Sequence, residues 1–164
     1  EGTAVMANTY TGVSKTEAAR HLGKTRPGVV AFHDTVIYCL GGSVTSGGMV
    51  AVRRQRGGSA LSVHAVGRAA DFMVKVGTGP RVGRSPKQVG DELFSRLIAA
   101  APAIGLDEVI WWGKRWTPEK GLRTYFGVNQ HRDHVHGALD PSVADSTAPR
   151  DDLCRWFATA IFGA

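Results

Sequence analysis

The sequence contains little of what marks several large classes of protein. Cysteine occurs only twice among 164 residues, as Cys39 and Cys154, and neither belongs to a CxxC pair, which excludes a metal site built from thiolates. Whether these two cysteines form a disulfide depends on their separation, which the sequence leaves open. No run of about 18 apolar residues occurs, so we expect no membrane-spanning helix. The first residues also lack the basic segment and apolar core of a signal peptide.

Phosphate-binding loops and blocks of basic residues are absent as well. The glycine pairs at 41–42 and 47–48 do not fit the pattern GxxxxGK[S/T], so the sequence does not support nucleotide binding. The net charge of +6 favours anionic partners such as nucleic acid, anionic membrane or a cell wall that carries teichoic acid, unless it serves only solubility. The densest basic run, at 53–56, is interrupted by Gln55. It does not resemble a nucleic-acid-binding arm, and we expect no nucleic-acid partner.

Length and composition predict one globular domain with a buried core, and we expect a monomer. The chain is 43% hydrophobic and 21% charged, which is ordinary for such a domain. Its strand signals are not separated regularly by helices, which favours an α+β fold with a small antiparallel sheet flanked by helices. Within residues 1–164 we expect an N-terminal extension over 1–45, a catalytic core over 50–140 and a C-terminal helix over 151–162.

Helix signals are clear at two further places. Ser14 and Glu17 fit a capping box and predict a short helix that ends near residue 22. Ser85 and Pro86 fit the N-cap and first position of a longer helix that ends near Pro102. Runs rich in β-formers predict strands at 29–32, 35–40, 49–53, 69–76, 107–113 and 135–139. The pair 33–34 is expected to form a turn, and 114–127 an irregular polar stretch.

Four of the six histidines lie in two short segments, 62–71 and 131–136. A catalytic zinc site takes three protein ligands and leaves one position for water. His64 and Asp71 offer two ligands, and Gly67 between them permits a turn that brings both to one point. His134 and His136 share one face of a strand, so one of them can be the third ligand. The alternative is that these histidines are ordinary satisfied or exposed side chains, since such spacings also arise by chance.

Hydrolysis at such a site also needs a base for the attacking water. Asp133 is the leading candidate, provided that it lies in the loop before the strand begins, because in a regular strand it would face away from His136. His131, in the same polar segment, can bond the substrate or the developing oxyanion. The residues therefore predict a hydrolytic centre with one zinc ion.

At these positions the sequence resembles a known family. The segment 62–71 reads SxHxxGxAxD, the motif of the LAS-type zinc peptidases that cut peptidoglycan. That group includes D-alanyl-D-alanine carboxypeptidases and dipeptidases and phage endolysins that cleave L-alanyl-D-glutamate, and it shares its core with the Hedgehog signalling domain. The segment 133–136 matches the closing motif of the family. The approach at 56–62 and the turn at 111–113 are also similar, so the resemblance covers roughly residues 50–140.

The resemblance implies zinc on His64, Asp71 and His136, with Asp133 as general base where many members have Glu. It also implies an arginine, upstream of the first motif, that holds the scissile carbonyl or a substrate carboxylate. Arg53, Arg54 and Arg56 all qualify, and the substrate-binding residues that we expect are Arg54, Arg56, Ser62 and Trp112. His131 or His134 would complete the stabilisation of the oxyanion.

The expected function is that of a zinc metallopeptidase that hydrolyses amide bonds in peptidoglycan stem peptides or cross-links. Its partner would be bacterial peptidoglycan, and its place of action the bacterial cell wall. Since the chain lacks an initiator methionine and a signal peptide, we expect a processed chain or a domain of a bacteriophage lysin or virion protein. The alternatives are a metal-dependent nuclease and a zinc-containing domain that binds the wall without cutting it.

Overall fold

The computed structural model describes residues 9–147, and within them three helices pack on a six-stranded sheet. The strand order is β1-β2-β6-β3-β4-β5 and every neighbouring pair is antiparallel. The α+β class and the antiparallel sheet predicted from the sequence are thus confirmed. The strands are β1 Val44–Gly48, β2 Ala69–Val74, β3 Leu106–Trp111, β4 Lys114–Thr117, β5 Gly121–Thr124 and β6 His134–Leu139.

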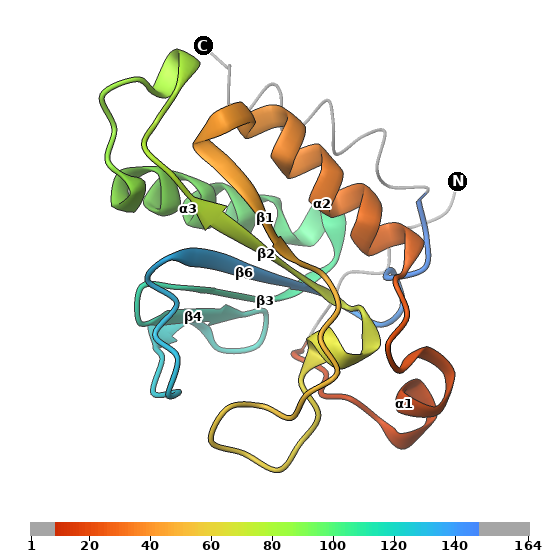
Figure 1. The fold of residues 1–164 in the computed structure, drawn as a ribbon. Coiled ribbons are helices and arrows are strands. Elements are labelled where there is room, and N and C mark those ends of the chain that lie inside the picture. Colours follow the sequence, from red (N-terminus) through yellow and green to blue (C-terminus); the bar gives the residue numbers. More distant parts are fainter. Residues whose placement is uncertain (1–8, 148–164) are drawn as a thin grey trace.

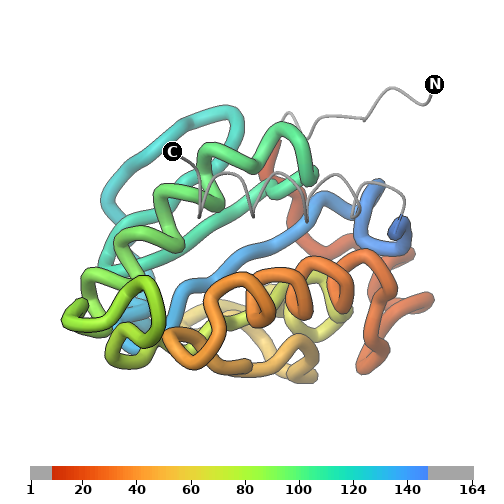
Figure 2. The backbone as a smooth tube through the Cα atoms, turned by 90° about the horizontal axis from the view of Figure 1, so that it is seen from above, coloured from red at the N-terminus to blue at the C-terminus, as the bar shows by residue number. Residues whose placement is uncertain are grey.

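Helices α2 (Pro27–Leu40) and α3 (Pro86–Ile104) cover one face of the sheet, and β6 runs between them when the molecule is seen from above (Figure 2). Their apolar side chains form the main core together with alternate residues of β2 and β6, among them Phe72 and Val135. Helix α3 begins as predicted, with a complete capping box at Ser85. It continues through Pro102, two residues beyond the predicted end.

The opposite face of the sheet carries the short helix α1 (Lys15–His21), the 3-10 turn η2 (Val63–Val66) and the loop that precedes it (Figure 1). Ser14 caps α1 as predicted, because its hydroxyl accepts the N–H of Glu17 at 3.0 Å, but the Glu17 carboxylate pairs with Arg26 at 2.7 Å instead of completing the capping box. Beneath this layer Arg68 is fully buried and paired with Asp107 at 3.2 Å. Because strand residues alternate between faces, Phe72 enters the main core while Asp71 points to this second face.

The predicted strands at 29–32 and 35–40 are wrong, since both segments belong to α2 and His33 lies in a helix instead of a turn. β-Branched residues favoured the strand prediction, but burial at Val29, Phe32, Val36 and Leu40 follows the helical period. Residues 49–53 form no strand, and 114–127 contains the β4–β5 hairpin instead of an irregular stretch. The expected extension over 1–45 thus supplies a core helix.

Two further expectations concern residues outside the described range. The helix expected at 151–162 lies outside them, as does Cys154, while Cys39 is buried in the main core. Within residues 9–147, no helix is long and apolar enough to cross a membrane.

Candidate metal centre

The three ligands predicted from the sequence meet on the second face of the sheet. His64 lies in η2, which begins where the hydroxyl of Ser62 accepts the N–H of His64 at 3.2 Å. The turn ends at Gly67 with φ +65°, and a β-carbon there would lie 2.0 Å from the carbonyl oxygen of Lys24. The chain then enters β2, where Asp71 is paired directly with His136 of β6. The predicted turn at Gly67, which brings the side chains of His64 and Asp71 together, is confirmed.

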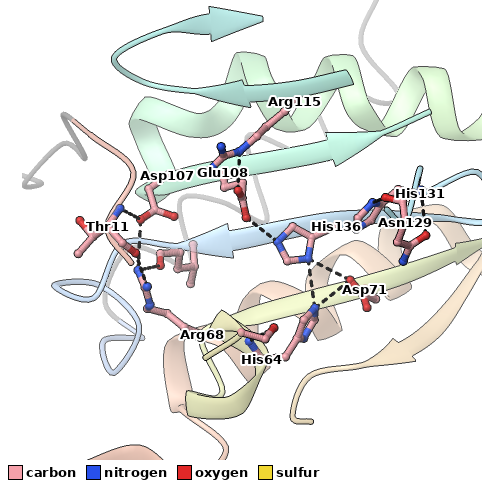
Figure 3. A network of polar contacts seen from close by, with 12 residues as sticks. Thr11, His64, Arg68, Asp71, Asp107, Glu108, Arg115, Asn129, His131 and His136 are labelled. Carbon is pink, nitrogen blue, oxygen red and sulfur yellow. Dashed lines mark hydrogen bonds and ion pairs between the residues drawn. The ribbon is translucent and has the colours of Figure 1, made fainter. Parts of the chain in front are cut away.

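The three ligand atoms form an almost equilateral triangle (Figure 3). Nε2 of His64 lies 3.2 Å from Oδ1 of Asp71 and 3.1 Å from Nδ1 of His136. The remaining edge, from Nδ1 of His136 to Oδ1 of Asp71, is 3.2 Å. A tetrahedral zinc ion with bonds of about 2.0–2.1 Å separates its ligands by about 3.3 Å. Two imidazoles and a carboxylate at this spacing suit a zinc ion, and the arrangement defines a possible metal site.

Both candidate histidine ligands use their second ring nitrogen for another contact. Nδ1 of His64 faces the carbonyl oxygen of Met49 at 3.4 Å. Nε2 of His136 lies 3.0 Å from Oε1 of Glu108, whose other oxygen is 2.6 Å from Nε of Arg115. Neither Glu108 nor Arg115 was predicted from the sequence. The available signal was a pair of acidic residues, Asp107 and Glu108, inside an otherwise apolar strand, since a buried carboxylate needs a partner.

Charge in the centre is organised around Asp71. Burial opposes its ionisation, but hydrogen bonds from His136 and His64 outweigh burial and hold the pKa of Asp71 far below its ordinary value. Burial likewise opposes protonation of His136, yet the hydrogen bonds to Asp71 and Glu108 raise its pKa to about 9. Without metal, His136 therefore keeps a proton on Nδ1, the nitrogen that a metal ion would bind.

His134 and Asp133 form a pair at the edge of the centre. Asp133 lies in the loop before β6, as its predicted role requires, because the strand begins at His134. The Asp133 side chain is 73% exposed and accepts from Nδ1 of His134 at 2.7 Å. This contact lowers the pKa of Asp133. The other nitrogen of His134, Nε2, lies 3.7 Å from Oδ2 of Asp71, so His134 stands between Asp133 and the metal ligands.

His131 packs against the same group, with its ring centroid 5.7 Å from that of His136 and 4.7 Å from that of His134. Its Nδ1 lies 2.7 Å from the carbonyl oxygen of Asn129, which can only accept, so Nδ1 carries the hydrogen. Burial, reinforced by the charges of His136 and His134, lowers the pKa of His131 to about 4. Neutral His131 is therefore an acceptor at Nε2, and donation to an oxyanion would require a second proton.

A cavity of about 400 Å³ opens beside the candidate ligands. Of the expected substrate-binding residues, Ser62 and Arg56 line it, and so does Arg53. Arg54 and Trp112 are not among its lining residues. Arg54 is bridged to Leu61 across the loop, and the charged groups of Lys87 and Arg132 lie 5.3 and 5.2 Å from the centre of the Trp112 ring. The remaining walls include residues for which the sequence predicted no role: Tyr10, Glu108, Arg115, Tyr125 and Asn129.

An antiparallel α+β fold with two histidines and one aspartate converging beside a cavity defines a protein with a candidate metal centre. The chain belongs to the family described as VldE, C-terminal domain, whose model matches residues 21–136. That match contains all three candidate ligands and ends at the last of them. No curated protein and no solved structure matched the chain. The family description names no reaction, so the function has to be argued from the site.

Proposed function

We propose that this protein is a zinc-dependent peptidase that hydrolyses amide bonds in peptidoglycan stem peptides or cross-links. The observation that carries the proposal is the triangle of His64, Asp71 and His136, with edges of 3.1–3.2 Å, beside a cavity with basic walls. A bound zinc ion would supply electrophilic activation of the scissile carbonyl and of a water molecule. Zinc fits better than magnesium or calcium, because those ions prefer oxygen ligands.

The other groups of the site are suited to proton transfer. His134 presents Nε2 toward the centre, and Asp133 holds its Nδ1 at 2.7 Å. In this arrangement His134 accepts the proton of the attacking water and passes it to the leaving amine, while Asp133 stabilises the imidazolium that forms. The general base is thus His134, and Asp133, which was expected to be the base, assists it through their hydrogen bond. His131, neutral and with a free acceptor nitrogen, orients the water or a substrate N–H.

Substrate binding is assigned to the basic wall of the cavity. Arg53 and Arg56 lie on the loop that faces the ligands, and guanidinium groups bind carboxylates through paired hydrogen bonds. Stem peptides of peptidoglycan carry carboxylates, and many walls add phosphate groups. The positive net charge of +6 supports attraction to such a polyanionic surface.

The test is a paired digestion of purified peptidoglycan and of nucleic acid by the zinc-loaded protein and by Asp71→Asn. The proposal expects new amino groups from peptidoglycan only, and none with the variant. Release of oligonucleotides without wall peptides would instead assign a metal-dependent nuclease. Retention on the wall without any product would assign a binding domain.

A further inference from the structure

We propose that Glu108 is a positioning residue of the metal centre: it fixes which nitrogen of His136 faces the metal, and Arg115 holds it in place. This inference rests on the metal centre of the proposed function, but not on the reaction or the substrate. The three side chains come from three adjacent strands, β6, β3 and β4 (Figure 3). Ile110 is paired with His136 on one side and with Arg115 on the other, and Glu108 lies two residues before Ile110 on the same face of β3, next to both side chains.

The contact between Glu108 and His136 determines the tautomer. Oε1 of Glu108 lies 3.0 Å from Nε2 of His136, and a carboxylate can only accept a hydrogen bond. Nε2 therefore carries the hydrogen, and Nδ1 turns toward His64 and Asp71 at 3.1 and 3.2 Å. Without the carboxylate, nothing would fix Nε2 of His136 as the hydrogen-bond donor and leave Nδ1 free to bind the metal.

Arg115 explains how a carboxylate can stay charged at this depth. Glu108 is only 6% exposed, and a buried charge is costly unless its oxygens are paired. Nε of Arg115 bonds Oε2 of Glu108 at 2.6 Å, which leaves Oε1 for His136. The guanidinium in turn lies 4.7 Å above the ring of Tyr10. Both oxygens of the buried Glu108 carboxylate are thus paired, one with Arg115 and the other with the candidate ligand His136.

His64 lacks an equivalent support. Its Nδ1 faces a backbone carbonyl at 3.4 Å, beyond the usual length of a strong hydrogen bond. The two imidazole ligands are therefore held unequally, and His136 is the one whose orientation depends on a charged partner. Loss of such a partner typically weakens metal binding about tenfold to a hundredfold.

The experiment compares zinc dissociation constants, by competition with a chromophoric chelator, for wild type, Glu108→Gln, Glu108→Ala and Arg115→Ala. We expect binding about tenfold weaker for Glu108→Gln, up to about a hundredfold weaker for Glu108→Ala, and an intermediate loss for Arg115→Ala. The matched control is Glu92→Gln, because Glu92 pairs with Arg81 and Arg84 on the other face of the sheet. This control should lose stability and keep its zinc affinity.

A second measurement reports directly which nitrogen of the His136 imidazole carries the hydrogen. Long-range proton–nitrogen NMR spectra of the zinc-loaded wild type should show a protonated Nε2 of His136 whose hydrogen is protected from exchange. Glu108→Gln should lose that protection, and Glu92→Gln should keep it. Unchanged zinc affinity and an unchanged resonance in Glu108→Gln would overturn the positioning role, and so would a wild type that binds no zinc.

Neither readout involves a substrate, so the two proposals fail separately. Failure to cut peptidoglycan would refute the proposed function. The zinc affinities and the tautomer of His136 would still test the positioning role of Glu108. If Glu108→Ala does not fold, Glu108→Gln and Arg115→Ala, with unfolding monitored alongside, still decide the question.

Discussion

Nε2 of His64 and Nδ1 of His136 lie 3.1 Å apart in a site where both side chains are almost fully buried. Two imidazole lone pairs cannot face each other at this distance unless a proton or a cation lies between them. In the protein without metal the proton resides on His136. Burial opposes it, but hydrogen bonds to Asp71 and Glu108 raise the His136 pKa to about 9. Proton and metal ion therefore compete for one position.

Zinc affinity should consequently rise with pH. Below about pH 9 each bound ion must displace the proton of His136, so the apparent dissociation constant should fall about tenfold per pH unit from about pH 6 to about pH 8. Competition titrations, corrected for protonation of the chelator itself, measure this directly. A dissociation constant that does not change over that range would contradict the displacement of a His136 proton by the metal ion.

The Asp133–His134 pair should matter for turnover and not for metal binding. His134→Ala should lower kcat about a hundredfold to ten-thousandfold, and Asp133→Asn should lower it less, because the first removes the base and the second only its partner. Both variants should retain one zinc ion.

The chain offers a matched control in Asp34→Asn. Asp34 contacts His33 at 2.8 Å in the same way, but the other ring nitrogen of His33 contacts Ser46 at 2.7 Å instead of a candidate metal ligand. Steady-state kinetics with a soluble wall peptide provide the measurement. Equal activity of His134→Ala and wild type would exclude His134 as the base.

Gly67 should be required for folding. Its φ is +65°, and an added β-carbon would meet the backbone of Lys24 at 2.0 Å, so Gly67→Ala combines strain with a clash and should cost about 3 kcal/mol or more. Gly121 has the same φ of +65° with no atom within 4 Å of the added carbon. Gly121→Ala should therefore cost only about 1–2 kcal/mol. Urea unfolding of both variants provides the comparison, and equal losses would refute the clash.

The three neighbouring arginines, at 53, 54 and 56, should differ in their contribution to substrate binding. Arg53 and Arg56 line the cavity, whereas Arg54 does not. Arg53→Ala or Arg56→Ala should raise KM for an anionic wall peptide about tenfold, since a hydrogen bond to a charged group contributes about 1.5–3 kcal/mol. Arg54→Ala should leave KM unchanged. A larger effect at Arg54 than at its neighbours would show that the substrate follows another path.

The ligand set was predictable because short-range rules determine it. Strand alternation places Asp71 away from the core, and Gly67 allows the turn that returns His64 to it. Spacing alone left His134 and His136 open, because both share one strand face, and the choice of His136 came from the family resemblance. Glu108 and Arg115 could not be assigned in advance, since their approach to His136 depends on the order β6-β3-β4.

Helix α2, in contrast, was predicted wrongly from the sequence. Its β-branched residues suggested two strands, yet its buried residues repeat with the helical period and pack on the sheet. Tertiary packing overrode local propensity there. The β4–β5 hairpin was missed for a related reason, because its residues are mostly polar and half-buried at the sheet edge.

The central claim is metal-dependent cleavage of peptidoglycan, and mass analysis of digestion products tests it most directly. Purified peptidoglycan would be treated with the zinc-loaded protein, with protein stripped by a chelator, and with stripped protein to which zinc is returned. We predict new peptide products in the first and third digests and none in the second. The same products in all three, or no products in any, would contradict a zinc peptidase built on His64, Asp71 and His136.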